Sequence, residues 1–374
     1  MSSSGHIYFT LRLKENKMSI FNGKKISITL FGQSHSEAIG VTIDGLPAGI
    51  PVDEAEIAAF MKRRAPSASA FSTSRAEPDV PVFVSGVMNG VTTGAALTAV
   101  IYNKDQRSRD YSALVNTPRP GHADYTARVK YGGAEDYRGG GAFSGRMTAP
   151  LCVAGAVAVG YLKSLGITIG SHILSIGDVC DGVFDPVGIS ADELEAVISK
   201  PFPVKDDEKG AEMLEFIART RADGDSVGGV IECAAVGVPV GLGGELFDGI
   251  EATLARLVFS VPAIKGFEIG AGFNASRSFG SKNNDEFYFD GDKVKTRTNN
   301  AGGILGGITS GMPVTFKVAI KPTPSISKPQ KTVDLSTRKD TEITIGGRHD
   351  ACIVPRALPV IEACLSIAVL DEIL

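Results

Sequence analysis

Residues 25–31 read Lys-Ile-Ser-Ile-Thr-Leu-Phe, and polar and apolar side chains alternate in them as in a half-buried β-strand. Asp53 then precedes an amphipathic run through Arg64, where an aspartate cap predicts the start of a helix. The same reasoning predicts strands at 81–87, 96–102, 226–237 and 312–320, and helices at 147–165, 190–199, 244–260 and 355–373. Strict strand–helix alternation is absent, which favours an α+β fold over a doubly wound sheet.

The 374 residues are predicted to form one domain, because no internal repeat and no long Pro- or Ser-rich linker divides them. Two polar, turn-rich stretches, 280–300 and 321–340, are predicted to be loops. Loops beside a site often carry function, so both stretches are candidates for a binding role.

Composition indicates a soluble globular protein, with 43% apolar and 21% charged residues. A net charge of −4 gives no general attraction to nucleic acid or to an anionic membrane. The longest uncharged apolar run, Met147–Leu162, falls short of the roughly 20 residues of a membrane span and predicts a buried helix. Five cysteines without a Cys-x-x-Cys pair, and no secretory signal before Met18, predict a reduced cytoplasmic location.

Three of the five histidines, His35, His122 and His349, lie in turns that contain glycine or arginine. A histidine at such a turn can deliver a proton near neutral pH, although an ordinary hydrogen-bonded turn residue remains the alternative for each. His6 and His172 are interpreted as structural. No metal site is predicted, because only His349 and Cys352 have a ligand-like spacing and no third ligand lies nearby.

Basic residues accompany the glycine-rich turns, and a guanidinium fork suits carboxylate and phosphate groups. Arg119 and Arg348, each next to a Gly-His turn, are the stronger candidates, whereas the run 62–64 is equally typical of a solvated helix end. The whole set comprises Lys62, Arg63, Arg64, Arg75, Arg107, Arg109, Arg119, Arg138, Arg146 and Arg348.

Glycine makes up 44 of the 374 residues, a share well above the usual one of about 7%, and the glycines are clustered. Tyr-Arg-Gly-Gly-Gly at 137–141 precedes Ser144, Arg146 and a predicted helix, so backbone N–H groups, a hydroxyl and a guanidinium form an anion cradle. The cluster at 299–307 resembles a dinucleotide fingerprint, but a predicted strand follows it instead of a helix. The proline-braced segment 321–325 offers a cation and two hydroxyls to a terminal phosphate.

In order and spacing, six segments resemble the chorismate synthase family, and 105–111 (Asp-Gln-Arg-Ser-Arg-Asp-Tyr) is especially specific. The six are Arg119–Tyr125, Tyr137–Gly141, Asp225–Glu232, Asn299–Gly307, Lys321–Ser325 and Gly347–Asp350. The resemblance runs from about Ile20 to Leu374 and implies a single-domain α+β sandwich of antiparallel sheets and helices. Residues 1–17 have no counterpart, so we expect a domain at 18–374 that begins at Met18, after a non-homologous extension.

The resemblance also implies the reaction. Members of this family convert 5-enolpyruvylshikimate 3-phosphate to chorismate and phosphate by anti-1,4-elimination, the last common step of the shikimate pathway. The reaction needs reduced FMN (FMNH2) without net redox change, and the family assembly is a homotetramer. Whether the chain reduces its own flavin with NADPH stays open. Since no reductase domain or nucleotide fingerprint is present, we expect externally reduced FMN.

Residue roles follow from the same resemblance. His35 is expected to donate a proton toward the departing phosphate, His122 to protonate near the pyrimidine ring of the flavin, and Asp350 to assist removal of the ring hydrogen through the flavin. The expected ligands of the substrate anions are Arg64, Arg119, Arg146 and Arg348. The expected FMN contacts are Ala142, Phe143, Ser144, Gly306, Lys321, Pro322, Thr323, Pro324, Ser325 and Arg348.

Several positions near the expected site depart from the usual family pattern. The family usually has Glu at the position of Gln33 and Gly at that of Ser36. It usually has Arg at the position of Ala65, Arg-Ser at those of Ala142-Phe143, and Glu at that of Met147. The departures remove two arginines and two carboxylates, so the local charge stays roughly balanced. We interpret the chain as a divergent branch that still works; the alternative is a catalytically inactive flavin- or substrate-binding relative.

Overall fold

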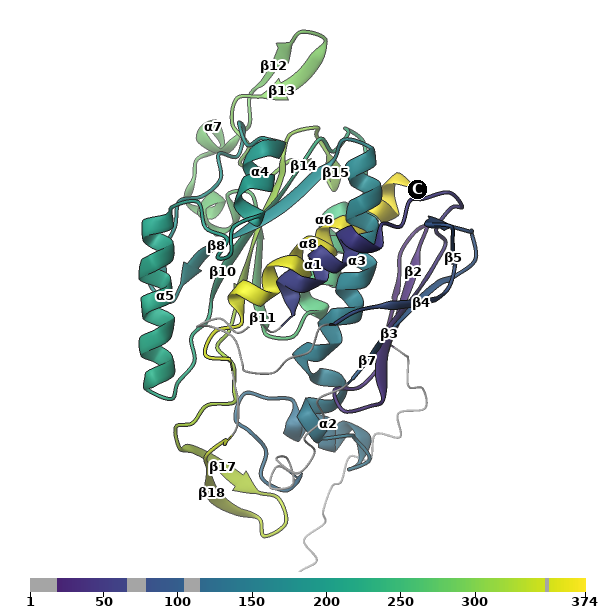
Figure 1. The fold of residues 1–374 in the computed structure, drawn as a ribbon. Helices are drawn as coiled ribbons and strands as arrows, with labels where there is room; N and C mark the ends of the chain where they lie inside the picture. The colour runs from purple at the N-terminus through teal and green to yellow at the C-terminus, as the bar shows by residue number, and fades with distance from the viewer. Residues whose placement is uncertain (1–18, 66–78, 104–114, 347–349) are drawn as a thin grey trace, which may run out of the picture.

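The computed structural model describes residues 19–65, 79–103, 115–346 and 350–374 (Figure 1). The expected extension 1–17, the specific motif at 105–111, and Arg75, Arg348 and His349 lie outside these ranges, so the predictions about them remain predictions. In the described part, two five-stranded antiparallel sheets enclose a layer of helices. The α+β sandwich predicted from the sequence is therefore confirmed.

The first sheet comes from the N-terminal part of the chain. Its alternation places Ile28, Val41 and Ala99 on one buried face that packs against the central helices. The predicted strand at 25–31 lies in this sheet. In spatial order, its strands are β1 (Ile20–Asn22), β2 (Ser27–Gly32), β3 (Ala38–Asp44), β7 (Leu97–Tyr102) and β4 (Val82–Ser85).

The second sheet lies on the other side of the helices and is also antiparallel throughout. It includes the strands predicted at 226–237 and 312–320, which are a few residues shorter than expected. In spatial order, its strands are β11 (Ile264–Ile269), β16 (Val314–Ile320), β10 (Gly229–Val236), β8 (Thr168–Ile176) and β9 (Val179–Cys180).

Three helices form the middle layer: α1 (Glu54–Arg64), α3 (Thr148–Ser164) and α8 (Val354–Ile373). The side chain of Asp53 caps α1 by accepting hydrogen bonds from the backbone N–H groups of Ala55 and Glu56, as predicted. Helix α3 packs against the first sheet and α8 against the second. The two helices approach closely because Gly155 of α3 lies against Ala363 of α8, where any side chain would collide.

Helix α3 and its preceding turn, Gly145–Ser164, are apolar and long enough to cross a membrane by length and composition. Their most apolar window is 67% buried inside the protein, however. This confirms the buried core helix expected from the uncharged run.

Strand β8 separates two environments, because successive side chains point to opposite faces of a sheet. Ser171 faces inward and donates a 2.6 Å hydrogen bond to Glu362 of α8. Gly170 faces outward and packs under Leu194 of α4. Helices α4 (Ala191–Ile198) and α5 (Asp207–Ala222) cover this outer face, whereas α6 (Ile250–Ser260) packs on α8 and β11.

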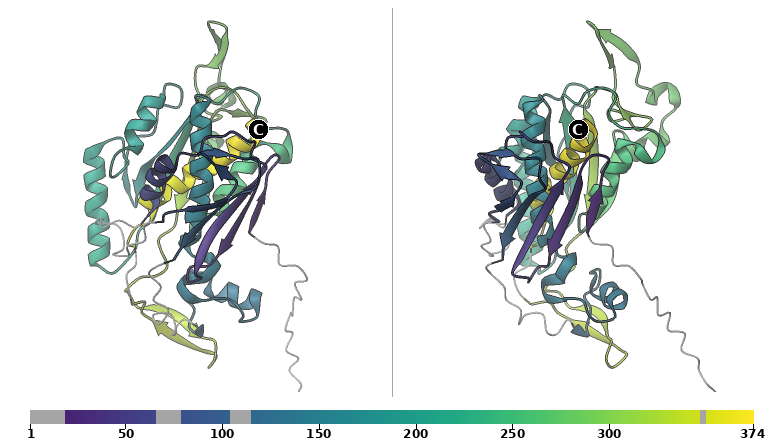
Figure 2. Two further views of the ribbon diagram at one scale, coloured as in Figure 1. Left: turned by 45° about the vertical axis from the view of Figure 1, so that its right-hand side comes forward. Right: turned by 90° about the vertical axis from the view of Figure 1, so that its right-hand side faces the viewer.

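The prediction of loops at 280–300 and 321–340 was wrong in part. In each segment, two strands pair to form a hairpin. These strands form two hairpins that extend from opposite ends of the molecule (Figures 1 and 2). Most of their side chains are exposed, so polar and turn-forming residues gave the segments a loop-like sequence. The hairpins are β12 (Phe287–Asp290) with β13 (Lys293–Thr296), and β17 (Gln330–Asp334) with β18 (Lys339–Ile343).

The helix predicted at 244–260 begins later, at Ile250, because a 3-10 turn at Leu246–Asp248 comes first and Leu246 has a left-handed φ of 53°. The other predicted helices are confirmed within one or two residues. The remaining short elements are α2 (Asp124–Tyr131), α7 (Gly280–Asn283), β5 (Val87–Met88), β6 (Val91–Thr92), β14 (Ile304–Leu305), β15 (Ile308–Thr309) and the 3-10 turns Arg138–Phe143, Gly145–Met147 and Gly272–Arg277.

Candidate functional site

The candidate site lies at the end of the sandwich where α1 ends and α3 and α8 begin. Most of the predicted residues come from segments that enter or leave these helices or from the turns between the strands beside them. The N-terminal ends of two helices carry partial positive charge, which favours anions.

The centre of the site is the loop Arg138–Phe143. Its three glycines have φ values of 60°, 83° and 55° at Gly139, Gly140 and Gly141, in the left-handed region that favours glycine. The carbonyl of Gly141 accepts a 3.1 Å hydrogen bond from the backbone N–H of Ser34. The sequence prediction of a backbone-lined cradle before α3 is consistent with this conformation.

This glycine loop lies between two of the predicted proton donors. A methyl group on Gly139 would collide with the imidazole of His35. A methyl group on Gly140 would come within 3.1 Å of Nε2 of His122. The fold therefore brings together His35 and His122, which are far apart in the sequence.

His35 is held in the turn between β2 and β3 and is only 4% exposed. Ser36 fixes this turn, because its hydroxyl accepts a 2.8 Å hydrogen bond from the backbone N–H of Gln33 and donates one of 2.7 Å to the carbonyl of Ala38. Asn103 then joins the turn to an arginine: its amide donates to the Ser36 carbonyl at 2.8 Å, and its oxygen accepts from Nε of Arg146 at 3.0 Å. The unusual Ser36 thus has a structural role in placing His35.

His122 belongs to an ionic cluster with Arg119 and Asp124. Arg119 is 7% exposed, and its Nε and Nη2 donate to the Asp124 carboxylate at 2.7 and 2.8 Å. Burial of Asp124 favours its neutral form, but hydrogen bonds from Arg119 and His122 outweigh burial and lower the pKa of this carboxyl. Asp124 is therefore ionised and only accepts hydrogen bonds.

The ionised Asp124 fixes the imidazole of His122. Nδ1 of His122 lies 2.5 Å from Oδ1 of Asp124, so Nδ1 carries a proton and donates a hydrogen bond to the carboxylate. The other nitrogen, Nε2, faces Gly140 of the glycine loop and lies 3.3 Å from Nη2 of Arg119. His122 can therefore exchange a proton at Nε2 while Asp124 holds its orientation.

The segment Lys321–Ser325 lies beside this cluster. The ammonium of Lys321 donates to the carbonyl of Gly121, and the hydroxyl of Ser325 accepts from Nη1 of Arg119 at 3.0 Å. Burial, and after it the neighbouring charge of Lys265, lower the pKa of Lys321. The Lys321–Ser325 segment thus presents one cation and two hydroxyls where the sequence predicted an anion contact.

Two further predicted arginines share one buried carboxylate. Nη1 of Arg64 lies 2.5 Å from Oδ2 of Asp79, and Nη1 of Arg146 pairs with Oδ1 of the same group. Arg64 also donates to the Thr148 hydroxyl at 3.2 Å and to the Gly145 carbonyl at 3.0 Å. These contacts join the end of α1 to the start of α3.

Asp350 is anchored at both its backbone and its side chain. Its carbonyl accepts a 3.0 Å hydrogen bond from the Thr323 hydroxyl, and its carboxylate lies 2.5 Å from Nη1 of Arg356. Nε of Arg356 donates in turn to the carbonyl of Arg64 at 3.1 Å. Asp350, the Lys321–Ser325 segment and the Arg64 pair are thereby linked into one network.

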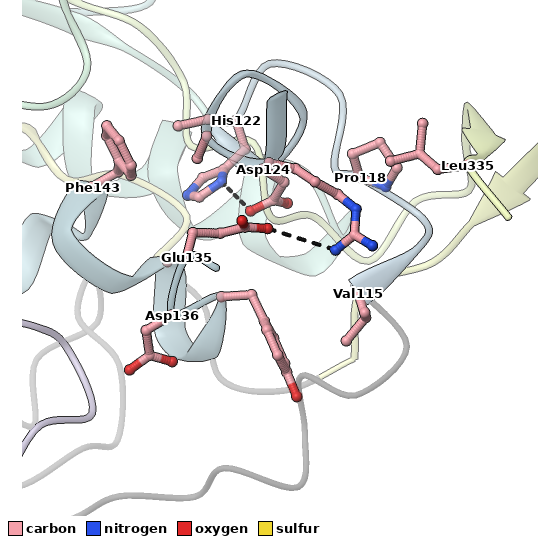
Figure 3. Close-up of a pocket in the computed structure, with 13 residues that line it drawn as sticks. Val115, Pro118, His122, Asp124, Glu135, Asp136, Phe143 and Leu335 are labelled. Atoms are coloured by element: carbon pink, nitrogen blue, oxygen red, sulfur yellow. Dashed lines mark ion pairs between the residues drawn. The ribbon is translucent and has the colours of Figure 1, made fainter. Parts of the chain in front are cut away.

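A small, open pocket lies beside the cluster, between α2, the glycine loop and the end of β17 (Figure 3). His122, Asp124 and Phe143 line it together with Glu135, whose carboxylate lies 3.7 Å from Arg128. The predicted proton donor and a predicted cofactor contact therefore share one cavity wall.

Some predicted residues are less well supported. Gly306 lies in the β14–β15 turn, before β16 begins, whereas Lys321 follows the end of β16; a seven-residue strand spans about 20 Å, so this chain does not bring them together. Ala142 and Phe143 are exposed, and the ring of Phe143 lies 6.4 Å from that of Tyr131. Met147, where glutamate is usual in the family, packs against the core.

Four residues of the network were not predicted: Asp79, Asn103, Asp124 and Arg356. Asp124 follows His122 by two positions in a quoted motif, so its charge was a usable signal. Arg356 is the one basic residue of α8, which was a weaker signal. Asp79 and Asn103 act on residues far away in the sequence, and no local pattern identifies them.

The profile of the chorismate synthase family matches residues 26–374. The chain belongs to the chorismate synthase family. A chorismate synthase from Thermococcus gammatolerans is 48% identical over 353 residues, which cover 94% of this chain and 97% of that protein. One from Methanosarcina mazei is 46% identical over 94% of this chain and 95% of its own length. A crystal structure of a chorismate synthase matches with a TM-score of 0.72 and 29% identity, over 94% of this chain and 92% of that one.

Membership confirms the resemblance drawn from the motifs, the fold class and the enzyme class. Chorismate synthases are lyases of the shikimate pathway, and the family uses reduced FMN. In the chorismate synthase fold of this chain, most of the predicted site residues lie at one end of the sandwich. They are His35, His122, Arg119, Arg64, Arg146, Asp350 and Lys321–Ser325.

Proposed function

We propose that this site removes phosphate from 5-enolpyruvylshikimate 3-phosphate to give chorismate, with reduced FMN bound beside the substrate. The observation that carries the proposal is the position of His35 and His122 on two sides of one glycine loop, within a cluster of buried arginines. Proton donors and anion ligands are thus adjacent, as loss of a charged leaving group requires.

The charge of the substrate supports the arginine roles. Two carboxylates and a phosphate carry about −4 near neutral pH. Arg64, Arg119 and Arg146 are each oriented by an aspartate and by further hydrogen bonds. A planar guanidinium fork is the side-chain group best suited to carboxylate and phosphate. We include Arg348 in this set on the family resemblance alone.

The residues present fit reduced FMN. At Gly139 and Gly140 the absence of a side chain lets the loop backbone pack directly against His35 and His122, the two residues expected beside the cofactor. Lys321, Thr323 and Ser325, braced by Pro322 and Pro324, offer a cation and hydroxyls to the cofactor phosphate. Ala142, Phe143 and Ser144 follow the glycines directly. When bound, reduced FMN supplies an electron-rich ring that the reaction regenerates.

The protein supplies the proton transfers. In our proposal His35 donates a proton as the C–O bond to phosphate breaks, and phosphate leaves with the bonding electrons. His122, oriented by Asp124, exchanges a proton at Nε2 near the cofactor ring. Asp350 accepts the proton derived from the ring C–H bond, held in place by Arg356. One C–O and one C–H bond break and a new C=C bond forms, without net redox change.

We also propose a cytoplasmic homotetramer. Exposed aromatic side chains support an interface between subunits, since large exposed apolar groups mark association surfaces. Phe287 and Phe289 on the β12–β13 hairpin are 65% and 78% exposed, and Phe247 is 93% exposed. Light scattering at micromolar concentration tests this assembly; a monomer with full activity contradicts it.

The test of the proposed function is anaerobic phosphate release from 5-enolpyruvylshikimate 3-phosphate with chemically reduced FMN. Turnover is expected with reduced FMN and not with oxidised FMN alone. A parallel reaction with oxidised FMN and NADPH, without a reductase, tests the expectation that reduction is external. Tight binding of substrate and FMN without phosphate release would instead support the inactive relative.

A further inference from the structure

Asp79 holds a position in the arginine cluster that neither its sequence nor the family comparison assigns. Its carboxylate bridges Arg64 through Oδ2 and Arg146 through Oδ1. The Asp79 side chain is 0% exposed, and those of Arg64 and Arg146 are 5% and 12% exposed. One buried negative charge therefore lies between two buried positive charges.

The backbone of Asp79 is in an uncommon conformation. Its φ of 49° lies in the left-handed region, which few residues other than glycine adopt, although aspartate is among those enriched there. A strained residue persists only where the surrounding structure determines it, and such residues concentrate at functional sites. The two ion pairs are contacts of this kind.

Each guanidinium has a second anchor on the protein. Arg64 donates through Nε to Thr148 and through Nη2 to the Gly145 carbonyl. Arg146 donates through Nε to Asn103. These neutral contacts fix one edge of each fork, but they do not offset the repulsion between two adjacent buried cations. Asp79 offsets that repulsion and defines the spacing of the two forks.

We propose that Asp79 is a positioning residue that holds Arg64 and Arg146 as a matched pair for one anionic group of the substrate. This inference rests on the proposed function, in which both arginines bind the substrate. Asp79 touches neither the substrate nor the reacting atoms; it acts through the two guanidinium groups. The alternative is that the Asp79 carboxylate occupies the place of the substrate anion between the two arginines and competes with the substrate.

Asp79→Asn separates these roles, because it keeps the shape and removes the charge. We expect the substrate KM to rise about 10- to 100-fold, the loss that follows when charge-assisted hydrogen bonds are misplaced. The kcat at saturation and the Kd for FMN, measured by fluorescence titration, should change less than about threefold. A purely structural role would alter melting temperature without this split between KM and kcat. Asp290→Asn, in an exposed ion pair with Lys295, is the matched control and should leave KM unchanged.

An unchanged KM in folded Asp79→Asn overturns the inference, and a lower KM shows competition and overturns it as well. Arg64→Lys and Arg146→Lys test the underlying proposed function separately, because both should raise KM. If they do not, the proposed substrate site is wrong; if they do while Asp79→Asn has no effect, only the present inference fails.

A second measurement remains informative where Asp79→Asn alone does not fold. Arg146→Gln combined with Asp79→Asn removes one charge of each sign, which a buried site tolerates better than an unpaired cation. Since Asp79 also positions Arg64, the double variant should have a higher KM than Arg146→Gln alone, with a similar kcat at saturation. A KM equal to that of Arg146→Gln overturns the proposal.

Discussion

His35 and His122 pack against adjacent glycines of one loop, His35 beside Gly139 and His122 beside Gly140. The loop residues follow one another with left-handed φ values, so the two imidazoles are spaced by a stretch of backbone that only glycine adopts readily. Any side chain at Gly139 must displace His35. The spacing of the two proton donors is therefore determined by the glycine loop.

Gly139→Ala is expected to lower kcat by about 10² or more, because the new methyl group moves a general acid out of reach of its proton acceptor. Anaerobic phosphate release gives kcat, and urea unfolding gives stability. Gly132→Ala is the matched control: its φ of 62° equals that of Gly139 within 2°, yet nothing lies within 4 Å of the added methyl group. The control should lose about 1–2 kcal/mol of stability and keep its kcat. Equal kcat losses in both variants would show that strain alone, and not the collision with His35, explains the effect.

Replacement of His35 or His122 by alanine should lower turnover by about 10² to 10⁴, the usual contribution of positioned proton transfer. FMN affinity, measured by fluorescence titration, should change much less. Normal turnover in both variants would mean that each histidine is only a hydrogen-bonded turn residue and that the proton donors lie elsewhere.

The sequence predicted the main helices well. The capped α1 was identified from its aspartate cap and the period of its apolar side chains, and α3 and α8 from long apolar runs, which result from burial on nearly all sides. The hairpin β17–β18 was predicted as a loop because its exposed strands lack that period. At the site, the motifs identified His122 and Arg119 but not Asp79, which reaches Arg64 and Arg146 only through the fold. An ion pair between residues far apart in the sequence produces no recognisable sequence pattern around either residue.

The buried His172 was interpreted as structural, and its surroundings predict a pH effect on stability. Nδ1 lies 3.2 Å from Asp181 and Nε2 lies 2.9 Å from Glu232. Burial opposes the charged imidazole, but the two carboxylates outweigh burial and raise the pKa of His172. The folded state thus holds this proton more tightly than the unfolded state does. The stabilisation is complete below about pH 6.5, the ordinary pKa of histidine, and is lost as the pH rises through the raised value.

Urea unfolding between pH 6 and pH 9 measures this effect. The free energy of unfolding of the wild-type protein should fall over this range relative to that of His172→Gln, whose neutral amide cannot titrate. Parallel profiles for the two proteins would show that His172 has the same proton affinity in the folded and unfolded states, contrary to this prediction.

Glu362 of α8 pairs with Arg63 of α1 through two hydrogen bonds of 2.6 Å, and its side chain is 2% exposed. Glu362→Gln should cost about 3–5 kcal/mol of stability, because it leaves a guanidinium without its buried counter-charge. The matched control is Glu212→Gln on α5, since Glu212 pairs with Lys209 in solvent and its loss should have little effect. A similar melting temperature for Glu362→Gln and Glu212→Gln would show that the buried pair contributes no more than a surface pair.

Replacement of Asp350 distinguishes a role of this residue in proton transfer from a purely structural role. Arg356 holds its carboxylate at 2.5 Å, and the Thr323 hydroxyl holds its carbonyl at 3.0 Å. Asp350→Asn keeps the backbone contact and the side-chain shape but removes the base. If Asp350 accepts the proton from the substrate ring, the variant should fold, bind reduced FMN and substrate, and turn over at least about 10²-fold more slowly. An aspartate that serves only to neutralise Arg356 behaves differently, because the loss of its charge leaves a buried guanidinium unpaired. That variant would have a lower melting temperature or weaker substrate binding while kcat at saturation stayed largely intact, and Asp350 would then have no part in the proton transfer.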